Sequence, residues 1–360
     1  LRIVTVGSCV TCLLTSCHGM YFPYQAAKGQ LALVGAAQDI DEVLQDKVTD
    51  PLTRSRLELA MRALDFAQEH LALGSRGNYR RYTALNRRYV VWNVFAAPEF
   101  SSDLKQYCFP VAGCVSYRGY FNEDDANAVA NRMRRKGNDV VVVGVAAYTT
   151  LGWFRDPLLD TFVLGSEEGL IRTLFHELAH LRLYVPGDTD WNESYASAVS
   201  ELGVQAFSVA QPFPLPTLTD QAQWAEKARQ TERLILAART DLTALYSKEL
   251  SAEVLRTKKS ERLARLKADY RDLIGGWPKA PYQRLMTGQV NNASLALVQS
   301  YSGLTPRFIE LHRVLGGNFE HFHEAVRRLS TFDASRRRDP NLWNNVIAVL
   351  DQESTRAGDQ

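Results

Sequence analysis

The spacing of apolar and polar residues divides the chain into a helical beginning, a mixed middle and a helical end. Apolar residues recur every three or four positions over 24–45 and 52–73, which predicts two amphipathic helices. Two short apolar segments rich in β-branched residues, 89–95 and 139–146, predict buried strands. A further short strand is predicted at 161–164. The middle of the chain therefore supplies a small sheet.

Helical periodicity dominates the rest of the chain. The other predicted helices are 124–136, 167–184, 190–207, 219–246 and 251–273. Prolines at 212, 214 and 216 mark a boundary, after which the last two of these helices form a charged αα-hairpin followed by shorter helices. We predict an α+β fold, mainly α-helical with a small mixed sheet, divided into a core over 17–211 and a helical region over 212–360. The second part either forms a separate domain or caps the core.

Composition narrows the classes of function. Hydrophobic residues make up 46% of the 360 residues and charged residues 23%, so the chain can bury a sizeable core and is not disordered. With 42 basic and 40 acidic residues the net charge is +2, and no basic cluster is interleaved with aromatic residues. These features argue against a nucleic-acid binder. No apolar run reaches the roughly 18 residues that a membrane-spanning helix needs.

The first seventeen residues have the pattern of an export signal. Arg2 precedes an apolar stretch, 3–14, that is long enough for a signal peptide but too short to span a membrane. The stretch ends on Leu-Thr-Ser-Cys17, which matches the lipobox of bacterial lipoproteins, so we predict removal of residues 1–16 and lipidation of Cys17. Because residue 18 is His rather than Asp, we expect the periplasmic face of the outer membrane. The alternatives are an ordinary signal peptide and a buried N-terminal strand.

The same prediction sorts the five cysteines. Cys9 and Cys12 form a C-x-x-C motif, but both lie in the segment that is predicted to be removed. Cys108 and Cys114 remain as an even pair in a chain exported to an oxidising compartment. This favours a disulfide that closes a short loop over two buried free thiols.

An H-E-x-x-H motif at 176–180 is the most specific chemical signal in the chain. On a helix, His176 and His180 project from one face, one turn apart, so both imidazoles can bind one zinc ion. Glu177 lies about 100° around the helix from His176, close enough to act as general base on a zinc-bound water. The alternative is two core histidines around a surface glutamate.

The third ligand must come from another segment. The metzincin order H-E-x-x-H-x-x-G-x-x-H is excluded, because Leu183 stands at the glycine position and Pro186 at the third histidine position. In gluzincins the third ligand is a Glu on the following helix. Glu193 opens the next predicted helix, 13 residues after His180, and the turn at Pro186-Gly187 would bring it back over the zinc. We therefore predict Glu193 as the third ligand.

Two alternatives stay open for Glu193. Asp190 and Glu193 have the spacing of a capping box, so Glu193 can instead serve its own helix start. Glu201, two turns further on the same face, is the alternative third ligand. Ser197 stands where thermolysin-like enzymes carry an Asp that orients a zinc-bound histidine, and Glu201 is the predicted substitute for that role.

Zinc with three protein ligands and one open position is typical of a hydrolase. The metal lowers the pKa of its water to about 7, and Glu177 takes the proton before attack on a polarised carbonyl. The oxyanion that forms needs a further hydrogen-bond donor. The candidate donors are Tyr148, Tyr195, Tyr301 and His312, of which Tyr148 and Tyr195 enter the predicted catalytic set.

Longer segments of the chain resemble the putative aminopeptidase family of proteobacterial exported proteins. These segments are 90–100 (VVWNVFAAPEF), 108–114 (CFPVAGC), 117–121 (YRGYF), 148–159 (YTTLGWFRDPLL), 175–180 (FHELAH), 187–189, 192–194 and 291–293. The resemblance spans most of the mature chain. It implies a zinc metallopeptidase and lipoprotein, with His176, His180 and Glu193 as ligands and Glu177 as the catalytic base.

An aminopeptidase must also bind the free α-amine, normally with a carboxylate. Glu99 and Glu123 are candidates, although each is equally well an ordinary surface acid. The resemblance favours an aminopeptidase, whereas the same zinc site without an amine anchor makes an envelope endopeptidase. A third hypothesis is a non-catalytic lipoprotein whose helical hairpin binds a partner, and the intact Glu177 argues against it. The predicted cofactor is Zn²⁺, and the predicted partners are a peptide or protein substrate and the membrane through Cys17, with no nucleic acid.

Overall fold

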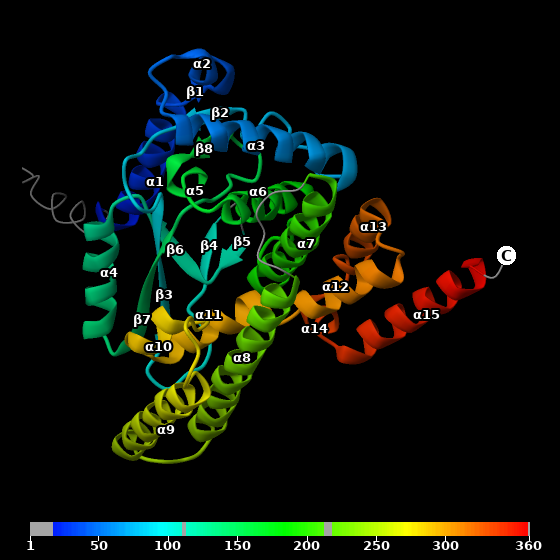
Figure 1. Cartoon of the computed structure of the whole chain (residues 1–360). Helices are drawn as coiled ribbons and strands as arrows, with labels where there is room; N and C mark the ends of the chain where they lie inside the picture. The colour runs from blue at the N-terminus through cyan, green and yellow to red at the C-terminus, as the bar shows by residue number, and fades with distance from the viewer. Residues whose placement is uncertain (1–16, 110–112, 212–217, 359–360) are drawn as a thin grey trace, which may run out of the picture.

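The computed structural model describes residues 17–109, 113–211 and 218–358 (Figure 1). Its helices are α1 (Cys17–Gly35), α2 (Ile40–Gln45), α3 (Pro51–His70), α4 (Glu123–Arg135), α5 (Asp160–Val163), α6 (Glu167–Arg182), α7 (Thr189–Ala210), α8 (Leu218–Tyr246), α9 (Ala252–Leu273), α10 (Gln283–Thr287), α11 (Asn292–Ser302), α12 (Thr305–Val314), α13 (Phe319–Leu329), α14 (Ala334–Arg337) and α15 (Pro340–Gly358). Its strands are β1 (Gln38–Asp39), β2 (Arg81–Thr83), β3 (Val91–Pro98), β4 (Tyr107–Phe109), β5 (Gly113–Val115), β6 (Tyr117–Tyr120), β7 (Asn138–Val145) and β8 (Leu158–Leu159).

This architecture confirms the predicted fold class, a mainly helical α+β protein with small sheets. The predicted helices that became α3, α4, α6, α7, α8 and α9 are confirmed to within a few residues at each end. In the described ranges, no helix is both long enough and apolar enough to cross a membrane. The predicted leader, 1–16, lies outside the described residues.

One helix and one strand were predicted wrongly. The pattern over 24–45 is not a single helix, because Gln38–Asp39 pairs with β2 and Asp39 caps α2 by accepting from the Asp41 N–H. The strand predicted at 161–164 is instead the short helix α5. β-branched residues favour a strand locally, but one helical turn buries both Phe162 and Val163 in the main core, and tertiary packing outweighs the local preference.

The central sheet separates two sides of the molecule. β3 lies between β6 and β7 and is antiparallel to both. Because side chains alternate along a strand, Trp92 and Val94 share one face and pack into an apolar cluster with α4. Asn93 lies on the opposite face, which borders the same cavity as α6 and α7. The sheet therefore has one structural face and one face available to a ligand.

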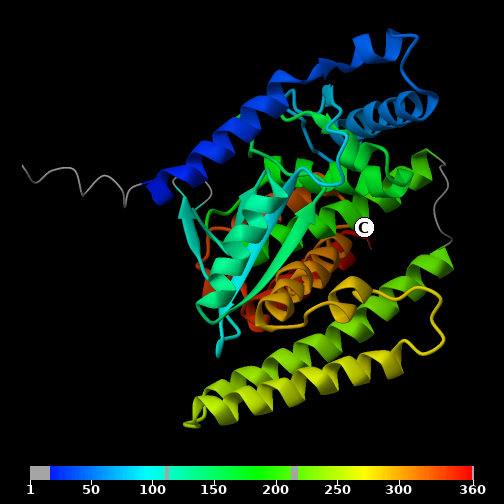
Figure 2. The same cartoon turned by 90° about the vertical axis from the view of Figure 1, so that its left-hand side faces the viewer.

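The main hydrophobic core crosses the boundary predicted at residue 212. Phe175 of α6 and Trp191 of α7 belong to the same buried cluster as Phe308 of α12 and Trp343 of α15. The α8–α9 hairpin packs into a second, separate hydrophobic cluster together with α10 and α11. Figure 2 shows this hairpin on the side of the molecule opposite α1. The last helices thus complete the core that holds α6 and α7.

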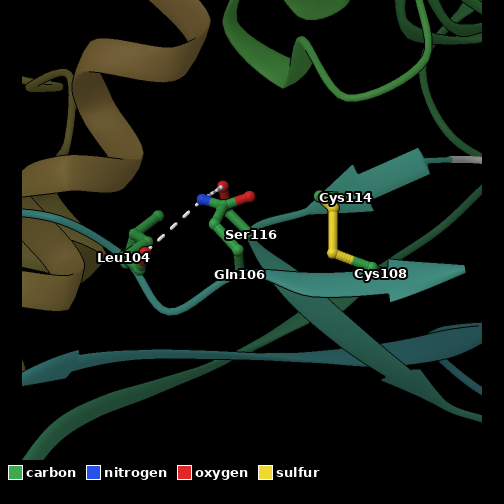
Figure 3. Close-up of a disulfide and its surroundings, with 5 residues drawn as sticks. All are labelled: Leu104, Gln106, Cys108, Cys114 and Ser116. Carbon is green, nitrogen blue, oxygen red and sulfur yellow. Dashed lines mark hydrogen bonds between the residues drawn. A yellow bond between two sulfur atoms is a disulfide. The ribbon is translucent and has the colours of Figure 1, made fainter.

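A disulfide joins Cys108 of β4 to Cys114 of β5 (Figure 3). At the open end of this hairpin, the Gln106 side-chain amide donates to the Ser116 hydroxyl at 2.9 Å. Both cysteines lie at opposed positions of the antiparallel pair, so the covalent bond fixes the register of two very short strands. The hairpin is therefore held by a covalent bond at its middle pair and by a side-chain hydrogen bond at its open end.

The turn between α6 and α7 is fixed from two sides. A Cβ built on Gly113, whose φ is +72°, would lie 2.6 Å from the Gly187 nitrogen, so only glycine allows the hairpin to pack this closely on the turn. On the other side, Asp188 caps α7 by accepting from the Trp191 N–H. Its carboxylate is 2.6 Å from Arg337 Nη2, and both side chains are buried. These contacts set the angle at which α7 leaves the turn.

Replacing Arg337 with Leu is expected to lower the free energy of unfolding by about 3 kcal/mol, the lower end of the range for breaking a buried pair. The lower end applies because Arg338 still contacts Asp188, at 2.5 Å. Urea denaturation gives the value. The control is Arg338→Leu. Because the Arg338 side chain is 41% exposed, we expect this variant to lose at most about 1 kcal/mol of unfolding free energy. Equal losses in the two variants would contradict the role assigned to the buried pair.

Candidate metal centre and active site

Two histidines of α6 and one glutamate of α7 converge where these helices pack together. His176 Nε2 lies 3.2 Å from His180 Nε2. Glu193 places one carboxylate oxygen 3.4 Å from His176 Nε2 and the other 3.9 Å from His180 Nε2. Among the described residues these three form a group of side chains that could hold a metal ion, with ligand atoms all within 4.8 Å of one another.

The separations fit a small tetrahedral metal ion. Ligand atoms about 2.0–2.1 Å from a tetrahedral zinc lie about 3.3–3.4 Å apart. The two imidazole nitrogens are 3.2 Å apart, close to that value. Glu193 approaches His176 at 3.4 Å and His180 at 3.9 Å with different carboxylate oxygens, and one ligand atom from each residue lies within 4.8 Å of the others. Two imidazoles and one carboxylate are also a donor set that catalytic zinc sites use. The types of these residues and their proximity therefore suit a zinc ion.

Glu193 is not needed as a helix cap. α7 begins at Thr189 and is capped by Asp188, so Glu193 lies beyond the positions that a cap serves. Glu201 lines the same cavity but is not in the ligand group. Within the described residues no hydrogen bond joins Glu201 to either imidazole, and His180 Nδ1 is buried without a partner. The structure thus brings Glu193, and not Glu201, to the histidines.

Burial and mutual charge set the protonation of the three ligands. Burial lowers the pKa of His180 to about 4, so its ring is neutral at physiological pH, as metal binding requires. Burial alone would raise the pKa of Glu193, but its hydrogen bond with His176 and the nearby His180 lower it below the usual value. Burial opposes protonation of His176, and Glu193 outweighs it and raises that pKa. The carboxylate is therefore ionised beside the two rings.

Glu177 has the position and the environment of a general base. It lines the same cavity as the ligands, and its side chain is only 8% exposed. Burial raises its pKa to about 7, partly offset by the neighbouring His176. A carboxylate with a pKa near neutrality takes and returns protons efficiently at the pH of most biological compartments.

The metal-binding group lies in a cavity of about 2010 Å³. Small-molecule sites are typically about 300–1,000 Å³, so this cavity suits a larger ligand such as a peptide. Its walls come from α6, α7, α8, α12 and the free face of the central sheet. On α7 the lining residues run from Thr189 to Val209, so the cavity follows nearly the whole helix.

Of the predicted oxyanion donors, Tyr148 lines the cavity. Its hydroxyl is buried with no hydrogen-bond partner in the described part of the chain. Tyr195 is fully buried outside the cavity lining, with its hydroxyl 2.8 Å from His323 Nδ1, so it is not available to a substrate. His312 packs on Phe319, also outside the lining. Tyr301 lies outside the residues whose side chains are described.

Two cavity tyrosines were missed by the sequence prediction, Tyr117 on β6 and Tyr184 after α6. Burial and the nearby charges of Glu193 and Glu177 raise the pKa of Tyr117, so it stays protonated and able to donate. No local sequence signal identifies Tyr117, because it reaches the cavity face through the register of β6 with β3, in which it is opposite Phe95, two residues along from Asn93.

The predicted α-amine anchors do not reach the cavity. Arg256 Nε donates to the Glu99 carboxylate at 2.6 Å, and this hydrogen bond lowers the pKa of Glu99. Glu123 lies in the first turn of α4 and is exposed. Neither residue lines the cavity, which favours the alternative that both are ordinary surface acids.

Comparison with known proteins identifies one family. A family model described as "Putative aminopeptidase" matches residues 21–340, which is well over half of the chain. No curated protein and no solved structure matches the chain.

Proposed function

Because the chain belongs to the putative aminopeptidase family, we propose that it is a zinc-dependent peptidase whose metal is held by His176, His180 and Glu193. The observation that carries the proposal is the joint placement of these donors and Glu177 on the wall of one large cavity. Bound zinc would supply a Lewis acid that activates water and polarises the scissile carbonyl.

The chain's own residues would do the rest. The Glu177 carboxylate accepts a proton from the attacking water and then donates it to the nitrogen of the departing amine. The phenol of Tyr117 donates a hydrogen bond to the oxygen that becomes negative at the carbonyl. Tyr117 is preferred to Tyr148 because it lies near the site residues. The charges of Glu193 and Glu177 help to raise the pKa of Tyr117, whereas the charge that raises the pKa of Tyr148 is that of Asp156.

Membership of the family favours release of residues from a free N-terminus, and the volume of the cavity favours a zinc endopeptidase as the second candidate. Matched peptides with a free or an acetylated N-terminus separate the two. An aminopeptidase loses nearly all hydrolysis on acetylation, and an endopeptidase does not. Absence of zinc-dependent hydrolysis for both sets would contradict the proposed function.

Replacing Tyr117 with Phe is expected to lower kcat by about 10²–10³-fold, the usual effect of losing one oxyanion donor. KM and zinc content should stay near their wild-type values, because the ring and its packing on Phe95 are kept. Steady-state kinetics with Tyr148→Phe as the matched control give the answer. A larger loss of kcat in Tyr148→Phe would transfer the role to Tyr148.

We further propose that the chain is exported and anchored to the periplasmic face of the envelope through lipid on Cys17. The disulfide between Cys108 and Cys114 supports export, because such bonds persist in oxidising compartments. Replacing Cys17 with Ser should move the protein from the membrane fraction to the soluble fraction of disrupted cells. An unchanged distribution of the variant would contradict the anchor.

A further inference from the structure

Several acidic side chains of the cavity have no function in the proposed reaction, and Glu201 is one of them. Glu201 lies on the cavity face of α7, eight residues beyond Glu193. Eight residues are a little more than two helical turns, so Glu193 and Glu201 lie toward the same side of α7, with their Cα atoms about 12 Å apart along the helix axis. Ser197 lies midway between them, about one helical turn from each, and lines the same wall.

Glu201 differs from the other acids of the cavity in lacking a partner. Glu168 is 2.5 Å from Arg172, and Glu310 is 2.9 Å from Arg313. Glu232 accepts a hydrogen bond from the Tyr282 hydroxyl. In the described structure no ion pair or hydrogen bond involves the carboxylate of Glu201. The wall therefore presents one uncompensated negative charge to whatever enters.

Two of the three Lys and Arg residues among the described lining are already paired with acids other than Glu201, and the third, Lys279, has no ion pair with Glu201. Arg172 is paired with Glu168, and Arg229 is paired with Glu226 at 2.9 Å. A ligand with its own positive charge would form an ion pair with the Glu201 carboxylate without breaking either of these pairs. Pairing in a partly enclosed cavity is worth more than on an open surface, because the local dielectric is lower.

The spacing between Glu193 and Glu201 along α7 limits which positive charge of a peptide can pair with Glu201. An extended peptide advances about 3.3 Å per residue, so 12 Å corresponds to between three and four residues. The α-amine of a residue released singly is within one residue of the scissile carbonyl and cannot reach Glu201. A Lys or Arg side chain one or two residues from the scissile bond can, because its long stem covers the remaining distance.

We infer that Glu201 forms a subsite for a basic side chain of the peptide substrate. The inference rests on the proposed function, since it takes the ligand of the cavity to be a peptide. It assigns to Glu201 a role in specificity in place of the predicted role at the metal. Peptides with Lys or Arg near the scissile bond are accordingly the preferred ligands.

Binding to the full chain carrying Glu177→Gln tests the inference without requiring catalysis. Peptides that differ only by Lys or Gln, placed in turn at each of the three positions on either side of the central bond, are titrated calorimetrically. Lys is expected to bind about tenfold more tightly than Gln at one position. The difference should disappear when Glu201→Gln is added and should reverse toward Glu-containing peptides with Glu201→Lys.

The matched control is Glu310→Gln, which removes a carboxylate of the same cavity that is already paired. It should keep the preference for Lys. Zinc content and thermal stability of all variants show whether a change is merely structural. An unaltered Lys preference in Glu201→Gln would overturn the inference, as would a preference that depends only on a free N-terminus. If these binding results hold but no peptide is hydrolysed by the wild-type chain, the proposed function fails while the subsite stands.

Discussion

Replacing Glu177 with Gln is expected to reduce peptide hydrolysis by about 10²–10⁴-fold, the usual contribution of a general acid–base group. Gln keeps the size of the side chain but neither accepts the proton of water nor returns one to the amine. Because Glu177 is not among the three metal-binding residues, zinc content should be unchanged. Both quantities are measured on the same preparation, kcat by a fluorogenic peptide and zinc by elemental analysis.

The control for this prediction is Glu168→Gln. Glu168 lies on α6 nine residues before Glu177, which is more than two helical turns away. Glu168 lines the cavity but is paired with Arg172, so its loss should change kcat by less than a few fold, as for a surface ion pair. Full activity of Glu177→Gln would remove the general base from the mechanism. Loss of zinc together with activity would instead make Glu177 a structural residue of the centre.

Replacing Glu193 with Ala is expected to weaken zinc binding by more than about 100-fold, the upper end of the effect of losing a residue that only supports a ligand. The carboxylate is the one charged donor of the group, so its removal leaves two neutral imidazoles. A ligand that binds only the folded protein stabilises it, and zinc at a free concentration of 100 times its Kd would raise the free energy of unfolding by about 2.7 kcal/mol. Thermal unfolding with and without zinc should therefore show a large shift for the wild type and almost none for Glu193→Ala.

Glu201→Gln is the matched control, because Glu201 is the other acid on the same face of α7. Its zinc-dependent shift should equal that of the wild type. A normal shift in Glu193→Ala and a lost shift in Glu201→Gln would reverse the assignment of the third ligand.

The candidate metal ligands could be predicted from the sequence because their placement depends on local geometry. A spacing of four on one helix places His176 and His180 on one face whatever the rest of the fold does. Glu193 follows after a short turn that leaves few ways to arrange two packed helices. The same local reasoning, applied to Tyr195, would have excluded it, since two residues beyond Glu193 is about 200° around the helix and points into the core.

The rest of the cavity could not be predicted, because it depends on contacts between distant segments. Tyr117 lies 59 residues before His176 and reaches the cavity through the pairing of β6 with β3. The wall formed by α8 follows the proline-rich boundary that suggested a separate region. The main core likewise joins α6 and α7 to Phe308 and Trp343, which no local pattern places beside them. Such contacts are set by burial of apolar surface over the whole chain.

The metal content of the purified wild-type chain tests the zinc centre most directly. After supply of zinc and removal of loosely bound metal, elemental analysis should find one zinc ion per chain, and none in the His176→Ala, His180→Ala double variant. No zinc in the wild-type chain under these conditions would contradict the centre, and so would an equal amount in the double variant.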